Sequence, residues 1–178
     1  MEILRRIKTG IDTYLELLGR RPVVFGRTHA GLTPILPQLL HSSGYRGVLH
    51  FAPLDGWRLG DDDQSVMQWQ GLDGTTCDAL IRYPIDAADS NGYADLASKL
   101  GRIIDNDRAA SIVFAHFSTQ ATRWLDDLLR MDRYAPSLGE FLLIDDYFEK
   151  VAGVGPVGKY GFERYGTYEL TRAAQAGE

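Results

Sequence analysis

The sequence predicts an α/β fold in which parallel strands alternate with helices. Short apolar runs rich in β-branched residues, such as residues 22–25, alternate along the chain with segments of helical period. Strands that alternate with helices form βαβ units, and these units build a parallel sheet. The chain has 178 residues, of which 44% are hydrophobic and 24% are charged, so it is long and apolar enough for one globular domain with a buried core.

The first part of the chain predicts a helix, a strand, a second helix and a second strand. Apolar residues recur at helical spacing over residues 3–18. Residues 22–25 are a short apolar run ended by a glycine, as expected of a buried strand. Thr33 can cap and Pro34 can open the second helix, and residues 47–51 form the second predicted strand.

The middle of the chain predicts a β-hairpin. Residues 66–69 and 75–83 both have the composition of strands, and Asp73-Gly74 between them suits the positive φ angles of a tight turn. Because this pair interrupts the alternation of strands and helices, we interpret it as a hairpin inserted into the parallel fold.

The alternation resumes after the hairpin. The predicted elements are a helix at residues 93–104, a strand at 110–117, a helix at 122–131 and a final strand at 141–144. We therefore expect residues 1–150 to form the domain. Residues 151–178 are rich in Gly and Tyr and lack a clear period, so we expect a C-terminal tail there.

Composition and charge exclude several classes of partner. Nineteen Lys and Arg stand against 24 Asp and Glu, with no basic block, so we expect no nucleic-acid partner. No apolar run approaches the roughly 20 residues of a membrane span, and no signal peptide is recognised, so we expect no membrane partner and take a cytoplasmic location only by default. The single cysteine, Cys77, leaves the redox compartment open, and we interpret it as a small core residue.

Polar side chains follow the predicted strands at their C-terminal ends, where parallel α/β folds assemble their sites. These candidates are Arg27, Thr28 and His29 after the first strand, Asp55 and Trp57 after the second, His116 near the end of the third, and Asp145 and Asp146 after the last. Each also has a structural interpretation, such as helix capping for Asp145 or a satisfied core histidine for His116. No HExxH, GxSxG or P-loop motif decides the chemistry.

Several motifs resemble the catalytic barrel of glycoside hydrolase family 38, the α-mannosidase family. Residues 21–25 (RPVVF) with residues 36–40 (LPQLL) are similar to the family's RPxxxWxPDxFGxxxxLPQIL segment. Residues 68–75 (QWQGLDGT) resemble its xWxGxDGS hairpin, and residues 140–148 resemble its closing strand and xxxEYF helix start. These motifs occur in the family's order and cover roughly residues 11–150.

The resemblance implies a parallel (β/α) partial barrel, similar to the second half of a seven-stranded β/α barrel with a hairpin insertion. Barrels of that family bind a divalent metal, usually zinc, and cleave α-mannosides with a carboxylate nucleophile and a carboxylate acid/base. Thr28 stands in the place of the metal-binding nucleophile, and a threonine supplies neither the carboxylate for a glycosyl ester nor a negative charge for a metal. The family's His-x-Asp metal ligands have no counterpart. We therefore expect no metal or other cofactor in the isolated chain, with zinc implied only for the parent family.

The positions after strand ends and the resemblance together assign roles to the candidate residues. His116 falls near the position of the family's acid carboxylate, where a histidine could still transfer a proton. Asp55 is the second candidate catalytic residue. The candidate substrate-binding residues are Arg27, Thr28, His29 and Trp57.

Three functional hypotheses stay open, and with them the question of whether the chain is an enzyme. The leading one is a fragment or degenerate form of an α-mannosidase-like domain, related to carbohydrate and inactive as an isolated chain. The second is a non-catalytic carbohydrate-binding or interaction module on the same scaffold. The third is a polysaccharide deacetylase-like metal hydrolase that uses His29, Asp55 and His116 as ligands or bases.

The partial barrel also predicts an open sheet edge. A strand at residues 22–25 that lacks a former neighbour leaves an apolar edge, and such edges invite association. We expect this strand to be terminal, with a missing N-terminal half-barrel or a second copy of the chain as its partner. We also expect at least four parallel strands in chain order, near Val23, Val48, Ala79, Val113 and Leu142.

Overall fold

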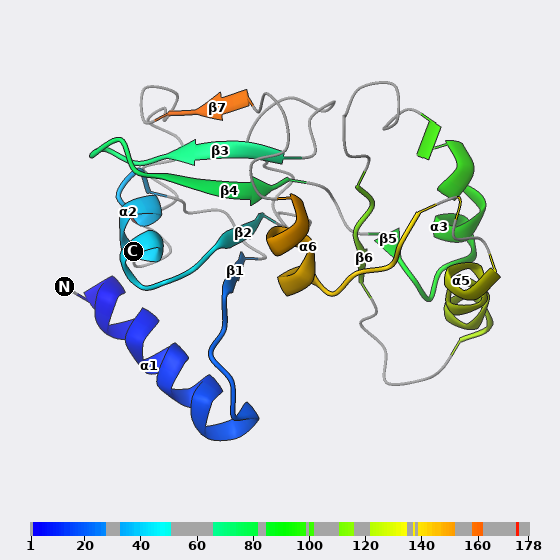
Figure 1. Ribbon diagram of the computed structural model, residues 1–178, viewed down its shortest axis with the longest axis horizontal. Helices are drawn as coiled ribbons and strands as arrows, with labels where there is room; N and C mark the ends of the chain where they lie inside the picture. The colour runs from blue at the N-terminus through cyan, green and yellow to red at the C-terminus, as the bar shows by residue number, and fades with distance from the viewer. Residues whose placement is uncertain are drawn as a thin grey trace.

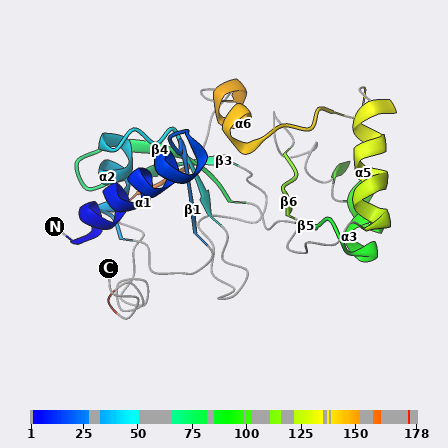
Figure 2. The ribbon, with the colours of Figure 1, turned by 90° about the horizontal axis from the view of Figure 1, so that it is seen from below.

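A computed structural model gives the fold of the chain as two sheets with helices packed around them (Figure 1). It describes residues 2–27, 33–50, 66–81, 85–98, 100–101, 111–115, 122–134, 137, 139–151, 158–161 and 174. Helix α6 lies between the two sheets in both ribbon views (Figures 1 and 2). None of the helices that the structure describes has the length and apolar character needed to cross a bilayer.

The larger sheet is open, mostly parallel and five-stranded, with the order β1-β2-β4-β3-β7. Its strands are β1 (Val24–Arg27), β2 (Gly47–His50), β4 (Thr76–Leu80), β3 (Val66–Gln70) and β7 (Gly158–Tyr160). Strands β1, β2 and β4 are parallel, β3 is antiparallel to β4, and β7 is parallel to β3. The first predicted strand is confirmed as β1, which begins at Val24 and not at residue 22, and the second is confirmed as β2 up to His50, the last described residue there. The predicted hairpin is confirmed as β3 and β4.

The hairpin is a full part of the sheet. Strand β4 pairs in parallel with β2 through Val48 and Ala79, so the hairpin's second strand continues the parallel series. Strand β1 pairs only with β2 among the described strands, which places it at the edge of the sheet as expected. At the other edge, β7 comes from the Gly- and Tyr-rich C-terminal segment and pairs with β3.

Helices α1 (Glu2–Leu18) and α2 (Leu36–Ser42) pack on one face of this sheet. The side chains of β3 alternate between partly buried and buried, because successive residues of a strand point to opposite faces. The buried core on this face consists of Ile7, Ile11, Leu36, Leu40, Val48, Met67, Trp69, Cys77, Ala79, Ile81 and Tyr160. Burial of each large apolar side chain among them stabilises the fold by about 1.5–3 kcal/mol.

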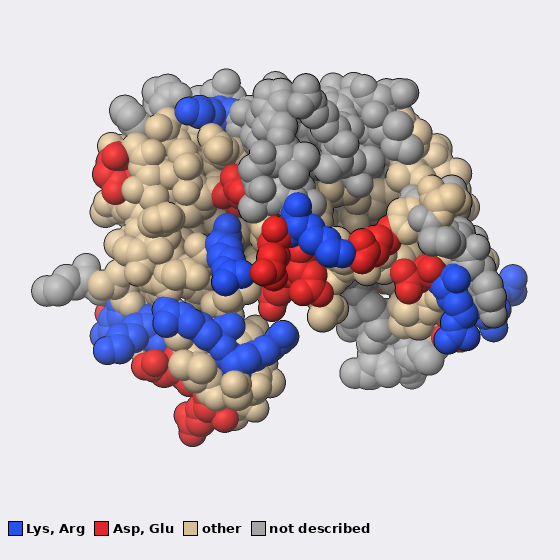
Figure 3. Space-filling model, in the orientation of Figure 1, with Lys and Arg blue, Asp and Glu red and all other residues tan. Residues whose placement is uncertain are grey.

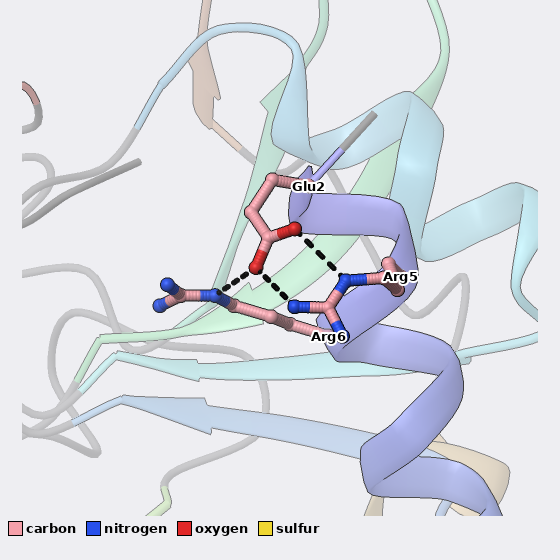
Figure 4. Close-up of polar contacts among 3 residues, drawn as sticks. All are labelled: Glu2, Arg5 and Arg6. Atoms are coloured by element: carbon pink, nitrogen blue, oxygen red, sulfur yellow. Dashed lines mark hydrogen bonds and ion pairs between the residues drawn. The ribbon is translucent and has the colours of Figure 1, made fainter.

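The first turn of α1 is also organised by charge. The Glu2 carboxylate accepts hydrogen bonds from Arg5 Nε at 2.9 Å and from Arg6 Nε at 3.0 Å (Figure 4). These hydrogen bonds hold the pKa of Glu2 at about 2. The three side chains are exposed to solvent, so the ion pairs define the helix start more than they stabilise the protein.

The second sheet consists of the short parallel strands β5 (Ile85–Asp86) and β6 (Phe114–Ala115). Helices α3 (Ser90–Ala94) and α5 (Arg123–Tyr134) contact each other beside it. Thr122 Oγ1 accepts a hydrogen bond of 3.3 Å from the backbone N–H of Leu125, which caps α5 at its start. The helix predicted at residues 122–131 is confirmed.

Two expectations about the parallel strands are wrong. No strand forms at residues 141–144, because Ile144 begins α6 (Ile144–Val151), whose first turn is already closed by a 2.9 Å bond from Tyr147 N to Leu143 O. Acidic residues in that first turn favour the helix start. The predicted third parallel strand, described at Phe114–Ala115, pairs with β5 instead of joining β1, β2 and β4. The larger sheet therefore has three parallel strands in chain order where at least four were expected.

Candidate functional site

The C-terminal ends of the parallel strands form one edge of the larger sheet. Arg27 at the end of β1 pairs with His50 at the end of β2, and Leu49 pairs with Leu80 at the end of β4. The chain therefore leaves all three strands at the same edge, as parallel α/β sites require. Of the residues predicted to take part in catalysis or substrate binding, only the backbone of Arg27 is described, and it lies at this edge.

The other predicted site residues lie outside the described part of the chain. They are Thr28, His29, Asp55, Trp57 and His116. Thr28 and His29 follow β1 directly in the sequence. His116 follows β6, which belongs to the second sheet. The meeting of these side chains in one site stays a prediction.

Asp145 and Asp146 are in the first turn of α6, in agreement with their interpretation as residues of a helix start. Asp145 Oδ2 also lies 3.5 Å from Arg20 Nη1, so it joins α6 to the segment after α1. Figure 3 shows acidic side chains gathered around α6 and basic ones along α1. The pair is solvent-exposed and long, so it orients the two segments with little effect on stability.

The structure also brings together three polar residues that the sequence patterns did not single out. Asp78 of β4 pairs with Gln68 of β3, and Gln68 pairs with Lys159 of β7. Their neighbours Cys77, Trp69 and Tyr160 belong to the core, so these three side chains point to the opposite face of the sheet. We call Asp78, Gln68 and Lys159 the polar row.

Apolar side chains lie beside one end of the polar row. Gly47 of β2 is the cross-strand neighbour of Asp78, and the ring of Phe148 from α6 lies directly over Gly47. Phe148 and Leu80, which are buried outside the α1–α2 core, are 3% and 1% exposed. Burial raises the pKa of the Asp78 carboxyl above its usual value.

Asp78 has no compensating partner within the described ranges. No hydrogen bond or ion pair between described residues involves its carboxylate, although Gln68 is its direct neighbour across the hairpin. Strand alternation in residues 75–83 could have placed Asp78 on the face opposite Cys77. Which residue of β7 lies beside Gln68 depends on strand register, and no local pattern in the sequence specifies that register.

The turn of the hairpin is a scaffold for these strands. Asp73 Oδ1 and Oδ2 accept bonds from the backbone N–H and the hydroxyl of Thr75 at 2.9 and 2.8 Å. These bonds lower the pKa of Asp73. Gly74 adopts a φ of 84°, which a glycine tolerates and most residues avoid. The backbone N–H of Leu72 donates to Pro34 O at 3.1 Å and fastens the turn to the start of α2.

Cys77 is a core residue, as the sequence suggested. Its Sγ lies 3.3 Å from Pro37 O and the side chain is buried. Burial raises the pKa of the thiol to about 11, so a thiolate nucleophile is absent at neutral pH.

Within the described ranges no group of three His, Cys, Asp or Glu side chains is placed to hold a metal ion. The positions through which the sequence resemblance implied zinc, Thr28 among them, lie outside those ranges. A threonine hydroxyl in place of a carboxylate is a poor zinc ligand.

Comparison with known proteins shows a likeness in fold alone. No protein-family model matches the sequence, and no curated protein matches it. The fold is similar to that of an alpha-mannosidase from Enterococcus faecalis V583, with a TM-score of 0.58 and 15% sequence identity over 87% of this chain. The chain spans 20% of the length of that protein. At this identity the likeness shows the fold alone, that of a partial α/β domain with an open, mostly parallel sheet.

Proposed function

We propose that the chain is a degenerate part of a family 38-like, α-mannosidase-like glycoside hydrolase domain, which contacts carbohydrate and does not cleave glycosides on its own. The observation that carries the proposal is the fold likeness to an alpha-mannosidase over 87% of the chain. The order of the RPVVF, LPQLL and QWQGLDGT motifs along the chain supports it independently of the coordinates.

The proposed site lies at the C-terminal edge of β1, β2 and β4. Arg27 ends β1 at this edge, Thr28 and His29 come next in the sequence, and Asp55 follows β2 in the sequence. Retaining cleavage of a glycoside requires two carboxylates roughly 5 Å apart, one as nucleophile and one as acid/base. With Thr28 in the nucleophile position, the site retains hydrogen-bonding groups for sugar hydroxyls and lacks the group that attacks the anomeric carbon.

A partner at the β1 edge is part of the proposal. Helix α1 buries Ile7 and Ile11 on its apolar stripe, whereas Tyr14, Leu15 and Leu18 continue that stripe with 48%, 45% and 57% of their surface exposed. The C-terminal half of α1 extends beyond β1 (Figure 1). One further strand beside β1 would cover these side chains, supplied by a missing N-terminal half-barrel or by a second copy of the chain.

An assay with an activated aryl α-mannoside tests the absence of catalysis. We expect no turnover with or without added zinc, and weak saccharide binding that His116→Ala reduces. The matched control is His41→Ala, which removes an exposed histidine of α2 and should change nothing.

Zinc-dependent hydrolysis that disappears in His116→Ala or Asp55→Ala would contradict the proposal. Such a result would instead support a metal hydrolase of the deacetylase-like type, with the catalytic groups at those two positions.

A further inference from the structure

We propose that the polar row of Asp78, Gln68 and Lys159 is a binding site for one residue of a neutral saccharide. This site lies on a face of the sheet, apart from the strand-end site proposed above. The choice of a saccharide among neutral polyhydroxylated ligands relies on the proposed function. The site itself follows from register, burial and charge.

Register places the three groups in one line. The Cα pairs Asp78–Gln68 and Gln68–Lys159 join three adjacent strands, and adjacent strands lie about 4.8 Å apart. The backbones of Asp78 and Lys159 are therefore about 10 Å apart, with the Gln68 amide between them. With their backbones this far apart, the Asp78 carboxylate and the Lys159 ammonium can stay unpaired with each other, and no ion pair joins them.

The chemistry of the row fits neighbouring hydroxyl groups. Asp78 accepts hydrogen bonds, Lys159 donates them, and the amide of Gln68 does both. A hydroxyl group also donates and accepts, so adjacent hydroxyls of a sugar ring can bond along such a row. The opposite charges at the two ends disfavour ionic ligands, because Asp78 repels an anion and Lys159 repels a metal cation.

Burial distinguishes the row from an ordinary solvated sheet face. Asp78 is partly buried beside Gly47 and the Phe148 ring, and its carboxylate lacks a partner in the described part of the chain. Partial desolvation of a carboxylate costs free energy, and carboxylates perturbed in this way are enriched at functional sites. Lys159 is exposed, so the polar row runs from the apolar side chains near α6 toward solvent at β7.

Backbone amide shifts in an NMR titration with methyl α-mannoside test the inference on the full chain. We expect shifts concentrated at residues 67–69, 77–79 and 159–160. Asp78→Asn keeps the side-chain shape and removes the charge, and it should weaken binding by about tenfold, the usual effect of losing a hydrogen bond to a charged group. Lys159→Met on the exposed end should also weaken binding. The matched controls Asp12→Asn and Lys8→Met, both exposed on α1, should leave the affinity unchanged.

The outcomes separate this site from the proposed function. Shifts at the row that His116→Ala leaves intact support the row alone. Shifts confined to residues 25–27 and 48–50, with affinity unchanged in Asp78→Asn and Lys159→Met, overturn the row and keep the strand-end site. Absence of saccharide binding overturns both. Calcium or zinc shifting the row residues in place of the saccharide also overturns the inference, because it would make the row a cation site.

Discussion

The ring of Phe148 lies directly over Gly47, in the space that a side chain at position 47 would fill. Through this contact α6 reaches the sheet face that α1 and α2 leave uncovered. Gly47 is also the cross-strand neighbour of Asp78. The absence of a Cβ atom at Gly47 thus allows α6 to pack on the sheet here, beside the partly desolvated Asp78 carboxylate.

Gly47→Ala should destabilise the protein. The added methyl group would overlap the Phe148 ring, and overpacking of this kind costs about 1–3 kcal/mol. Urea unfolding at neutral pH, followed by far-UV circular dichroism, measures the change. The matched control is Gly26→Ala in β1, where a Cβ atom has nothing within 4 Å. Equal losses in both variants would show that the effect comes from the strand backbone and not from Phe148.

Asp78→Asn should remove a pH-dependent penalty on stability. Burial raises the folded pKa of Asp78 above its unfolded value, so its contribution to stability is full below the unfolded pKa and is lost as pH rises through the folded pKa. The variant should therefore gain stability relative to the parent as pH rises from about 4 toward neutral. Urea midpoints across that range measure the difference, and a difference independent of pH would contradict the burial of the charge.

Asp73→Ala should show the opposite dependence. Its bonds from Thr75 lower the folded pKa, so its contribution is present above the unfolded pKa and is lost as pH falls through the folded pKa. The variant should have a lower melting temperature than the parent at neutral pH, and the gap should close in acid. Thermal melts at a series of pH values test this, with Asp12→Ala on the exposed face of α1 as the matched substitution.

Cys77 should react with thiol reagents only when the protein unfolds. The thiol is buried, lies 3.3 Å from Pro37 O and has a pKa of about 11. Alkylation with iodoacetamide at neutral pH should be slow in the native protein and rapid in denaturant. The control is Leu72→Cys in a Cys77→Ala background, because position 72 is 54% exposed in the hairpin turn and should react at once. Rapid native reaction of Cys77 would mean that β4 opens toward α2.

Local signals in the sequence predicted the elements whose boundaries depend on nearby residues. The stripe through Ile7 and Ile11 predicted α1, and Asp73-Gly74 predicted the hairpin, because periodicity and turn chemistry act over a few residues. Leu142 was wrongly placed in a strand, because an apolar run of that length is equally consistent with the start of a helix. The polar row was missed because register between β4, β3 and β7 depends on the whole sheet.

The edge at β1 should make the isolated chain associate in a concentration-dependent manner. Among the described strands β1 pairs only with β2, and the C-terminal half of α1, which carries the exposed Leu15 and Leu18, extends past β1 (Figure 1). An unpaired strand edge near apolar surface favours association. Analytical ultracentrifugation over a range of concentrations should detect it, and Leu18→Lys should reduce it by placing a charge on the apolar stripe. The matched control is Leu129→Lys, since Leu129 is 60% exposed on α5, beside the second sheet. A chain that stays monomeric at every concentration, or that responds equally to both substitutions, would show that the β1 edge does not drive association.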